Sequence, residues 1–169
     1  MRISGIMVTA RDMAHKYMVE NWPAWLAPLL KDRAIYHCGP VVKQDDDGYH
    51  ALSAGPTTSI REEPYAHRII SHYGPRIIIG KGGMGENTLT AMQAHGAIYV
   101  HAIGGAASFI ARSISRVHGV HMLTEFGPPE AFWELEVKHF TGVVTMDAHG
   151  ASLHQTVRQA SEAQLNALL

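Results

Sequence analysis

The apolar positions of the chain come in short runs that alternate with stretches of helical periodicity. Runs rich in Ile, Val and Tyr predict β-strands, and apolar residues spaced three and four apart predict helices. Strands are expected at residues 3–9, 34–37, 49–53, 76–79, 97–101 and 143–146, with Val137 in a further late strand. Helices are expected at residues 11–21, 62–72, 87–95, 106–117 and 153–169. The interleaved order predicts an α/β fold.

Breakers and turn residues refine this pattern. Pro23 and Pro28 should end the first helix, because proline cannot continue a helix interior. The polar run QDDDG predicts a hairpin turn between the strands at 34–37 and 49–53. The three isoleucines of the strand expected at 76–79 are typical of a central strand buried on both faces. No linker-like segment interrupts the 169 residues, so we expect a single domain over residues 1–169.

Charge and hydropathy exclude several classes of function. Lys plus Arg number 14 against 15 for Asp plus Glu, and no basic tract of the kind that binds nucleic acid is present. The apolar runs are far shorter than the roughly 20 residues that span a membrane. The first residues lack the apolar core and cleavage site of a signal peptide. We therefore expect a cytoplasmic location, with neither nucleic acid nor membrane as a partner.

The ligand-forming residues argue against a metal site within the chain. Cys38 is the lone cysteine, whereas a cysteine-ligated iron–sulfur cluster takes several thiolates. Any such cluster must therefore belong to another chain, and Cys38 is interpreted as a packed thiol. Among the twelve histidines, His118 and His121 have turn spacing, but no third ligand accompanies them. We predict no metal on these residues.

A glycine-rich loop at residues 80–85, GKGGMG, follows a predicted strand and precedes a predicted helix. Backbone N–H groups, a helix N-terminus and the ammonium of Lys81 converge there, which is the arrangement of an anion cradle. The loop is neither a Walker A motif nor a GxGxxG motif. A plain tight turn is the alternative.

Cationic residues stand at two further junctions. Residues 55–61, GPTTSIR, place three hydroxyls and Arg61 before a helix; the guanidinium can grip a carboxylate, or the segment is a helix-capping turn with a solvated Arg. Arg11 follows the first strand, where an ion pair with Asp12 is the alternative role. Such junctions gather at one edge of an open α/β sheet, so we expect Arg11, Arg61 and Lys81 to lie near one another.

Seven segments together resemble the C-terminal, or β-subunit, part of class I fumarases and L-tartrate dehydratases. In family order they are TARDMAHK (9–16), YHCGPVV (36–42), SAGPTTSIR (53–61), IIIGKGGMG (77–85), IGGAA (103–107), PEAFWELEVKHF (129–140) and DAHGASL (147–153). They span nearly the whole chain. The resemblance implies a swivelling β/β/α domain.

The resemblance also implies site residues and partners. By position, Thr57 matches the family's catalytic base, and Arg11, Arg61 and Lys81 match its ligands of the substrate carboxylates. The implied cofactor is a [4Fe-4S] cluster held by a partner α-subunit and not by this chain. The resemblance thus implies a hetero-oligomeric hydro-lyase that is active only with that α-subunit. Fumarate hydration is the first reading, L-tartrate dehydration is the close alternative, and mesaconate stays open as a substrate. The hypothesis from a different functional class is a non-enzymatic anion-binding module.

Overall fold

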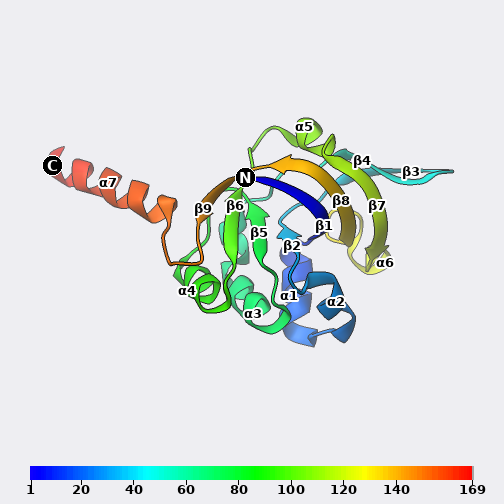
Figure 1. Cartoon of the computed structure of the whole chain (residues 1–169), viewed down its shortest axis with the longest axis horizontal. Helices are drawn as coiled ribbons and strands as arrows, with labels where there is room; N and C mark the ends of the chain where they lie inside the picture. Colours follow the sequence, from blue (N-terminus) through cyan, green and yellow to red (C-terminus); the bar gives the residue numbers. More distant parts are fainter. Residues whose placement is uncertain (169) are drawn as a thin grey trace.

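The computed structural model describes residues 1–168, and its centre is a seven-stranded mixed sheet (Figure 1). The strand order is β7-β8-β1-β2-β5-β6-β9. Its strands are β1 (Arg2–Thr9), β2 (Ala34–Tyr36), β5 (Ile77–Gly80), β6 (Ile98–His101), β7 (Ile114–His121), β8 (Phe132–Thr141) and β9 (Val143–Met146). The neighbours β1, β2, β5 and β6 are parallel, and antiparallel strands extend the sheet on both sides.

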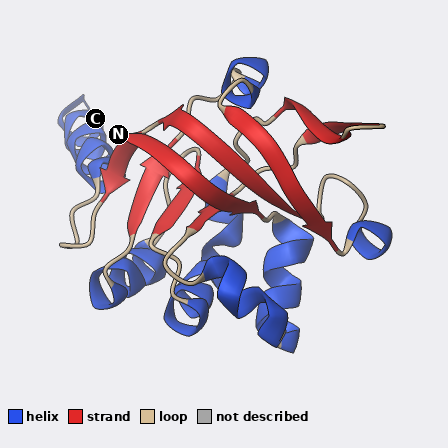
Figure 2. Ribbon diagram, turned by 45° about the vertical axis from the view of Figure 1, so that its right-hand side comes forward, coloured by secondary structure: helices blue, strands red, loops and turns tan. Residues whose placement is uncertain are grey.

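The helices in the first part of the chain cover one face of this sheet (Figure 2). The helices are α1 (Asp12–Asn21), α2 (Ala27–Leu30), α3 (Glu63–Tyr73), α4 (Glu86–His95), α5 (Ala107–Ala111), α6 (Leu123–Phe126) and α7 (Leu153–Leu168), with 3-10 turns η1 (Ala24–Leu26) and η2 (Ser59–Glu62). The first four bury Met18, Leu30, Ile70 and Met92 against the sheet. None of the helices within residues 1–168 is long and apolar enough to span a membrane.

The opposite face carries a two-stranded hairpin and α5. The hairpin strands are β3 (Val41–Asp45) and β4 (Gly48–Ser53). Tyr49 packs edge-on against the buried Trp133 of β8, with ring centroids 5.2 Å apart. A second apolar core, which includes Tyr36, Ile79 and Trp133, lies on this face. The α/β class and the interleaved order expected from the sequence are confirmed.

Three details of the expected secondary structure are wrong. The helix expected over 106–117 is only α5, and the chain then enters β7, which pairs with β8. The hairpin joins β4 to β3, not to the strand at 34–37, because β2 pairs with β1 and β5 in the main sheet. The first helix ends at Asn21 as expected, but Pro28 lies in the first turn of the short helix α2.

Helix α7 extends away from the sheet (Figure 1). The side chain of His154 in its first turn bonds the Thr145 hydroxyl at 2.9 Å, and its ring packs on Gly83 so closely that a Cβ there would lie 2.4 Å from it. Beyond that turn Val157, Leu165 and Leu168 are exposed. Within the described chain this apolar side of α7 has no covering element.

Candidate active site

The carboxyl ends of the parallel strands bring Arg11 and Lys81 to one edge of the sheet. Arg11 follows β1 and forms the N-cap of α1, and Lys81 follows β5. Strand β2 lies between β1 and β5 in register, so the three ends are aligned. This edge is where open α/β sheets bind ligands.

The turn that contains Thr57 runs along the same edge. The backbone N–H of Thr57 donates to the carbonyl oxygen of His37 at 2.6 Å, and the carbonyl oxygen of Thr57 accepts the N–H of Lys81 at 3.2 Å. The N–H of Ser59 donates to the Lys81 carbonyl at 2.9 Å. The turn is therefore fixed between the ends of β2 and β5.

The hydroxyls of this turn do not cap a helix. Thr58 occupies the N-cap position of η2 but makes no side-chain capping hydrogen bond. Its side chain is exposed, whereas Thr57 is half-buried and Ser59 is fully buried. The capping alternative for this segment thus lacks the hydrogen bond that would define it.

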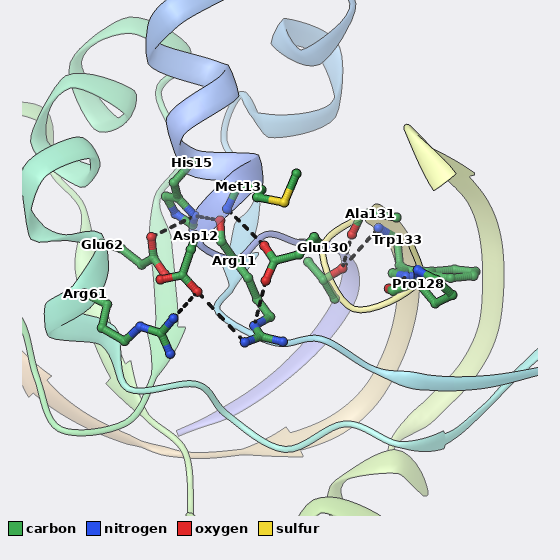
Figure 3. A network of polar contacts seen from close by, with 11 residues as sticks. Arg11, Asp12, Met13, His15, Arg61, Glu62, Pro128, Glu130, Ala131 and Trp133 are labelled. Atoms are coloured by element: carbon green, nitrogen blue, oxygen red, sulfur yellow. Dashed lines mark hydrogen bonds and ion pairs between the residues drawn. The ribbon is translucent and has the colours of Figure 1, made fainter. Parts of the chain in front are cut away.

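One carboxylate oxygen joins the two predicted arginines (Figure 3). Oδ2 of Asp12 lies 2.5 Å from Nη2 of Arg61 and 3.9 Å from Nη2 of Arg11. Arg61 is the more exposed of the two, with 52% of its side chain accessible against 26% for Arg11. The sequence expectation that Arg11 and Arg61 lie together is confirmed, and the expected Arg11–Asp12 ion pair is present as well.

Arg11 is held from its other side by Glu130. The Glu130 carboxylate lies 3.5 Å from Nε of Arg11 through Oε1, and its Oε2 accepts the N–H of Met13 at 3.0 Å. A side chain from the loop before β8 thereby satisfies one free N–H in the first turn of α1. The aliphatic part of Arg11 crosses Gly39, where a Cβ would lie 2.8 Å from Cδ of Arg11. A residue larger than glycine at that position would displace the guanidinium.

A buried pair, His15 and Glu62, lies next to the arginines (Figure 3). Their side chains are 1% and 0% exposed, and Nδ1 of His15 is 3.5 Å from Oε2 of Glu62. Nδ1 of His15 donates to the carbonyl of Arg11 at 2.9 Å, and neither oxygen of Glu62 has a hydrogen-bond partner among residues 1–168. Burial lowers the pKa of His15 to about 4. Burial, reinforced by the charge of Asp12, raises the pKa of Glu62 to about 8.

At neutral pH both members of this pair are therefore uncharged. The group then contains two cations, Arg11 and Arg61, and two carboxylates, Asp12 and Glu130. It is electrically balanced before any ligand arrives. Ionisation of Glu62 would add a third negative charge to this group of two cations and two carboxylates.

The glycine-rich loop has its N–H groups occupied by the protein itself. Those of Gly82 and Gly83 donate to Nδ1 of His101 and to the hydroxyl of Tyr99, each at 3.3 Å. At the N-terminus of α4 the Glu63 carboxylate accepts the N–H of Gly85 at 2.7 Å and that of Thr88 at 3.2 Å. The interpretation of this loop as an open anion cradle is therefore wrong, and the tight-turn alternative describes it. Only the ammonium of Lys81 stays available from this loop.

A buried hydrogen-bond chain ties the loop to the Thr57 turn. The Tyr99 hydroxyl donates to Oγ of Ser59 at 2.9 Å, and the same oxygen lies 2.9 Å from Nδ1 of His37. Burial lowers the pKa of His37 well below its ordinary value, so this ring is neutral. The chain fixes Ser59, and with it the neighbouring Thr57 and Thr58, relative to β2 and β5.

The potential metal ligands have other roles. His118 and His121 bond Glu136 and Glu134 across the β7–β8 pair at 2.9 and 2.7 Å. Cys38 is fully buried, and burial raises the pKa of its thiol to about 12. Among residues 1–168 no group of three or more His, Cys, Asp or Glu side chains is placed to hold a metal ion.

The charged and buried partners of the arginines were not identified as site residues from the sequence. They are His15, Glu62 and Glu130, together with Asp12, which was considered only as a surface partner of Arg11. Asp12 and His15 lie in the first turn of the helix that Arg11 opens, and Glu62 directly follows Arg61. An acid adjacent to a cation at a strand-to-helix junction was the available signal. Glu130 comes from a distant loop and offered no such signal.

Two cavities lie away from these residues. One, of about 330 Å3, lies beside α5, and the other, of about 450 Å3, is an open hollow on the exposed surface of α7 that is lined by residues of this helix alone. None of Arg11, Thr57, Arg61 and Lys81 lines either of them. The candidate site at the carboxyl edge of the sheet is thus separate from both.

Known proteins place the chain in a family. The model of the family described as Fumarase C-terminus matches residues 1–157. A protein of Geobacillus stearothermophilus named putative fumarate hydratase class I is 51% identical over 98% of this chain, which spans only 32% of that relative. The putative L(+)-tartrate dehydratase subunit beta of Methanocaldococcus jannaschii is 38% identical, with 99% of this chain and 87% of the relative covered. The L(+)-tartrate dehydratase subunit beta of Escherichia coli is 36% identical, over 89% of this chain and 75% of the relative. The chain belongs to the fumarase C-terminus family.

Proposed function

We propose that this chain is the β-type subunit of an iron–sulfur-dependent hydro-lyase that reversibly hydrates fumarate to malate. The observation that carries the proposal is the pair of guanidiniums, those of Arg11 and Arg61, joined by Asp12 at the edge of the sheet where the Thr57 turn lies. Membership of the fumarase C-terminus family and the 51% identical relative named as a class I fumarate hydratase support it.

The three cations would bind the dicarboxylate and stabilise its reacting form. Removal of a proton next to a carboxylate moves negative charge onto the carboxylate oxygens. Arg11, Arg61 and Lys81 would hold those oxygens in place and stabilise that charge as it develops. Arginine suits this role because its planar fork of N–H donors matches the two oxygens of a carboxylate.

Thr57 would move the proton at the carbon atom. In dehydration the deprotonated oxygen of Thr57 would take a proton from the substrate carbon and become a hydroxyl, and in hydration that hydroxyl would return the proton to the carbon. A hydroxyl is a weak base unless its deprotonated form is stabilised, so nearby cations are a physical requirement. The support is positional: the carbonyl of Thr57 accepts the N–H of Lys81, and Arg61 lies four residues farther along the same segment.

The residues of this chain do not fit an iron–sulfur cluster. Cys38 is the one cysteine of the sequence, it is fully buried, and its raised pKa opposes the thiolate form that binds iron. We therefore assign the cluster to a partner α-subunit, where it would act as a Lewis acid on the hydroxyl that is lost or gained. The exposed apolar side of α7 is the kind of surface that a partner subunit covers.

L-tartrate dehydration is the second candidate. Two relatives named as beta subunits of L(+)-tartrate dehydratase match this chain over 87% and 75% of their own lengths, which is how a separate subunit should match. Fumarate stands first because of the higher identity to the fumarate hydratase relative. Anaerobic turnover of fumarate, L-tartrate and mesaconate by the assembled enzyme separates the candidates. The substrate with the highest kcat/KM identifies the activity.

The clamp role of Arg61 is tested by Arg61→Lys, which keeps the charge and removes the planar fork. In the assembled enzyme kcat/KM should fall by about 10- to 150-fold, which corresponds to about 1.5 to 3 kcal/mol for a charged hydrogen bond. Arg76→Lys is the matched control, because Arg76 also pairs with an aspartate, Asp32, at 2.8 Å but precedes β5 at the opposite end of the strand. If Arg61→Lys keeps normal kcat/KM, Arg61 does not grip the substrate.

A further inference from the structure

The spacing between the two guanidiniums depends on Asp12. Its single oxygen Oδ2 contacts Nη2 of both arginines, at 2.5 Å for Arg61 and 3.9 Å for Arg11 (Figure 3). Asp12 is the first residue of α1, so its backbone is fixed by the helix. Arg61 comes from η2 and, among residues 1–168, has no other carboxylate within ion-pair distance. Without Asp12 the exposed Arg61 side chain would be free to move.

The contact leaves donors for a ligand. A guanidinium carries five N–H donors, and the contact with Asp12 engages only Nη2 of Arg61. Nε of Arg11 lies at ion-pair distance from Glu130, 3.5 Å, and has no hydrogen-bond partner among residues 1–168. The position of Glu130 is set by the N–H of Met13. Asp12 and Glu130 thus hold the two arginines, and among residues 1–168 most of the guanidinium donors have no partner.

We propose that Asp12 is a positioning residue that holds the guanidinium of Arg61 beside that of Arg11, so that their remaining donors receive the substrate together. The inference rests on the proposed function of the arginine pair. Arginine loses about 2 kcal/mol of side-chain entropy when it is fixed in one geometry. Because Asp12 already holds Arg61, much of this entropy is lost when the protein folds, and less is lost when the substrate binds.

The opposite role for Asp12 is that of an internal competitor for Arg61. Its negative charge repels a dicarboxylate, so its neutralisation by itself would tighten binding. The two roles differ in the reaction rate, because misplacement of a substrate-binding group by about 1 Å can lower the rate about 100-fold. A positioning role predicts a loss in kcat, and a competing role predicts normal kcat with a lower KM.

The experiment compares Asp12→Asn, Arg61→Lys and the double variant in the assembled enzyme, with succinate as a non-reacting dicarboxylate probe. Asp12→Asn should lower kcat about 10- to 100-fold and change the succinate inhibition constant by less than about tenfold. In the Arg61→Lys background the same substitution should lower kcat less than about threefold, because its effect passes through Arg61. Asp12→Glu, which restores the charge, should recover part of the loss. Asp32→Asn, which breaks an Arg–Asp pair far from the site, is the control and should leave kcat unchanged.

The outcomes separate this inference from the proposed function. If Arg61→Lys reduces kcat/KM but Asp12→Asn keeps normal kcat, Asp12 does not position Arg61 and only the inference is overturned. Equal losses from Asp12→Asn in both backgrounds, or its failure to fold, would make Asp12 a structural residue and also overturn it. If Arg61→Lys itself has no effect, the clamp of the proposed function is wrong.

Discussion

Thr57→Val should lower kcat of the assembled enzyme by about 100- to 10,000-fold, the usual contribution of a general base. Valine has nearly the shape of threonine but no hydroxyl, so the cations of Arg11, Arg61 and Lys81 stay in place. Affinity for succinate should therefore change by less than about tenfold. Steady-state kinetics together with succinate inhibition measure the two quantities separately.

Thr58→Val is the matched control for this prediction. Thr58 lies in the same turn, its side chain is exposed, and it makes no side-chain capping bond to η2. Its substitution should leave kcat within about threefold of the wild type, because surface changes away from such bonds have small effects. A large loss from Thr58→Val with none from Thr57→Val would mean that the base is misassigned. Failure of Thr57→Val to assemble would favour a structural role for the turn.

As the pH rises from about 4.5 to about 8, the free energy of unfolding of Glu62→Gln should rise relative to that of the wild type. The pKa of Glu62 is raised to about 8 by burial, so across this window the folded chain keeps a proton that the unfolded chain has released. The free energy of unfolding of the wild type therefore falls as the pH rises through the window, and glutamine removes this contribution. The difference should reach a few kcal/mol above pH 8, with about 5 kcal/mol as its upper limit.

Other groups near Glu62 have to be separated from it. His15 contributes the opposite slope: its pKa is lowered to about 4, so stability falls as the pH drops from about 6.5 towards 4 in both wild type and variant. Asp12, Glu130 and the two arginines face the same carboxyl group and are also present in both.

Chemical denaturation at a series of pH values gives the difference in the free energy of unfolding between Glu62→Gln and the wild type directly. Glu20→Gln, on the exposed side of α1, should shift the free energy of unfolding by at most about 0.5 kcal/mol, and a wild-type profile for Glu62→Gln would show that Glu62 is ionised in the fold.

Much of the fold followed from local pattern, and the errors arose where long-range pairing decided the structure. The alanine-rich start of the segment 106–117 does form α5, but residues from Ile114 onward pair with β8 instead of continuing the helix. Strand β3 has the polar, exposed sequence VVKQD and exists through its pairing with β4. In both places tertiary contacts outweigh the weak preferences of the local sequence.

The positions of the cations in the candidate site could be predicted from the sequence, but the side chains that hold these cations in place could not. The junction positions of Arg11 and Lys81 follow from the alternation of strand and helix, because parallel strands end at a common edge. Sequence could not show that Glu130 reaches back to Arg11 from the loop before β8, or that Glu63 occupies the N-terminus of α4. These contacts join segments distant in the chain, and they decide which cations and N–H groups stay available to a ligand.

The central claim is that this chain supplies the base and the carboxylate clamp while a partner subunit supplies the cluster. The direct measurement is anaerobic purification of the chain alone and together with a candidate α-subunit, followed by iron content, visible absorbance and fumarate turnover. We expect the chain alone to be folded, colourless, free of iron and inactive, and the complex to contain iron and to convert fumarate to malate. An iron–sulfur absorbance or fumarate turnover by the chain alone would contradict the account.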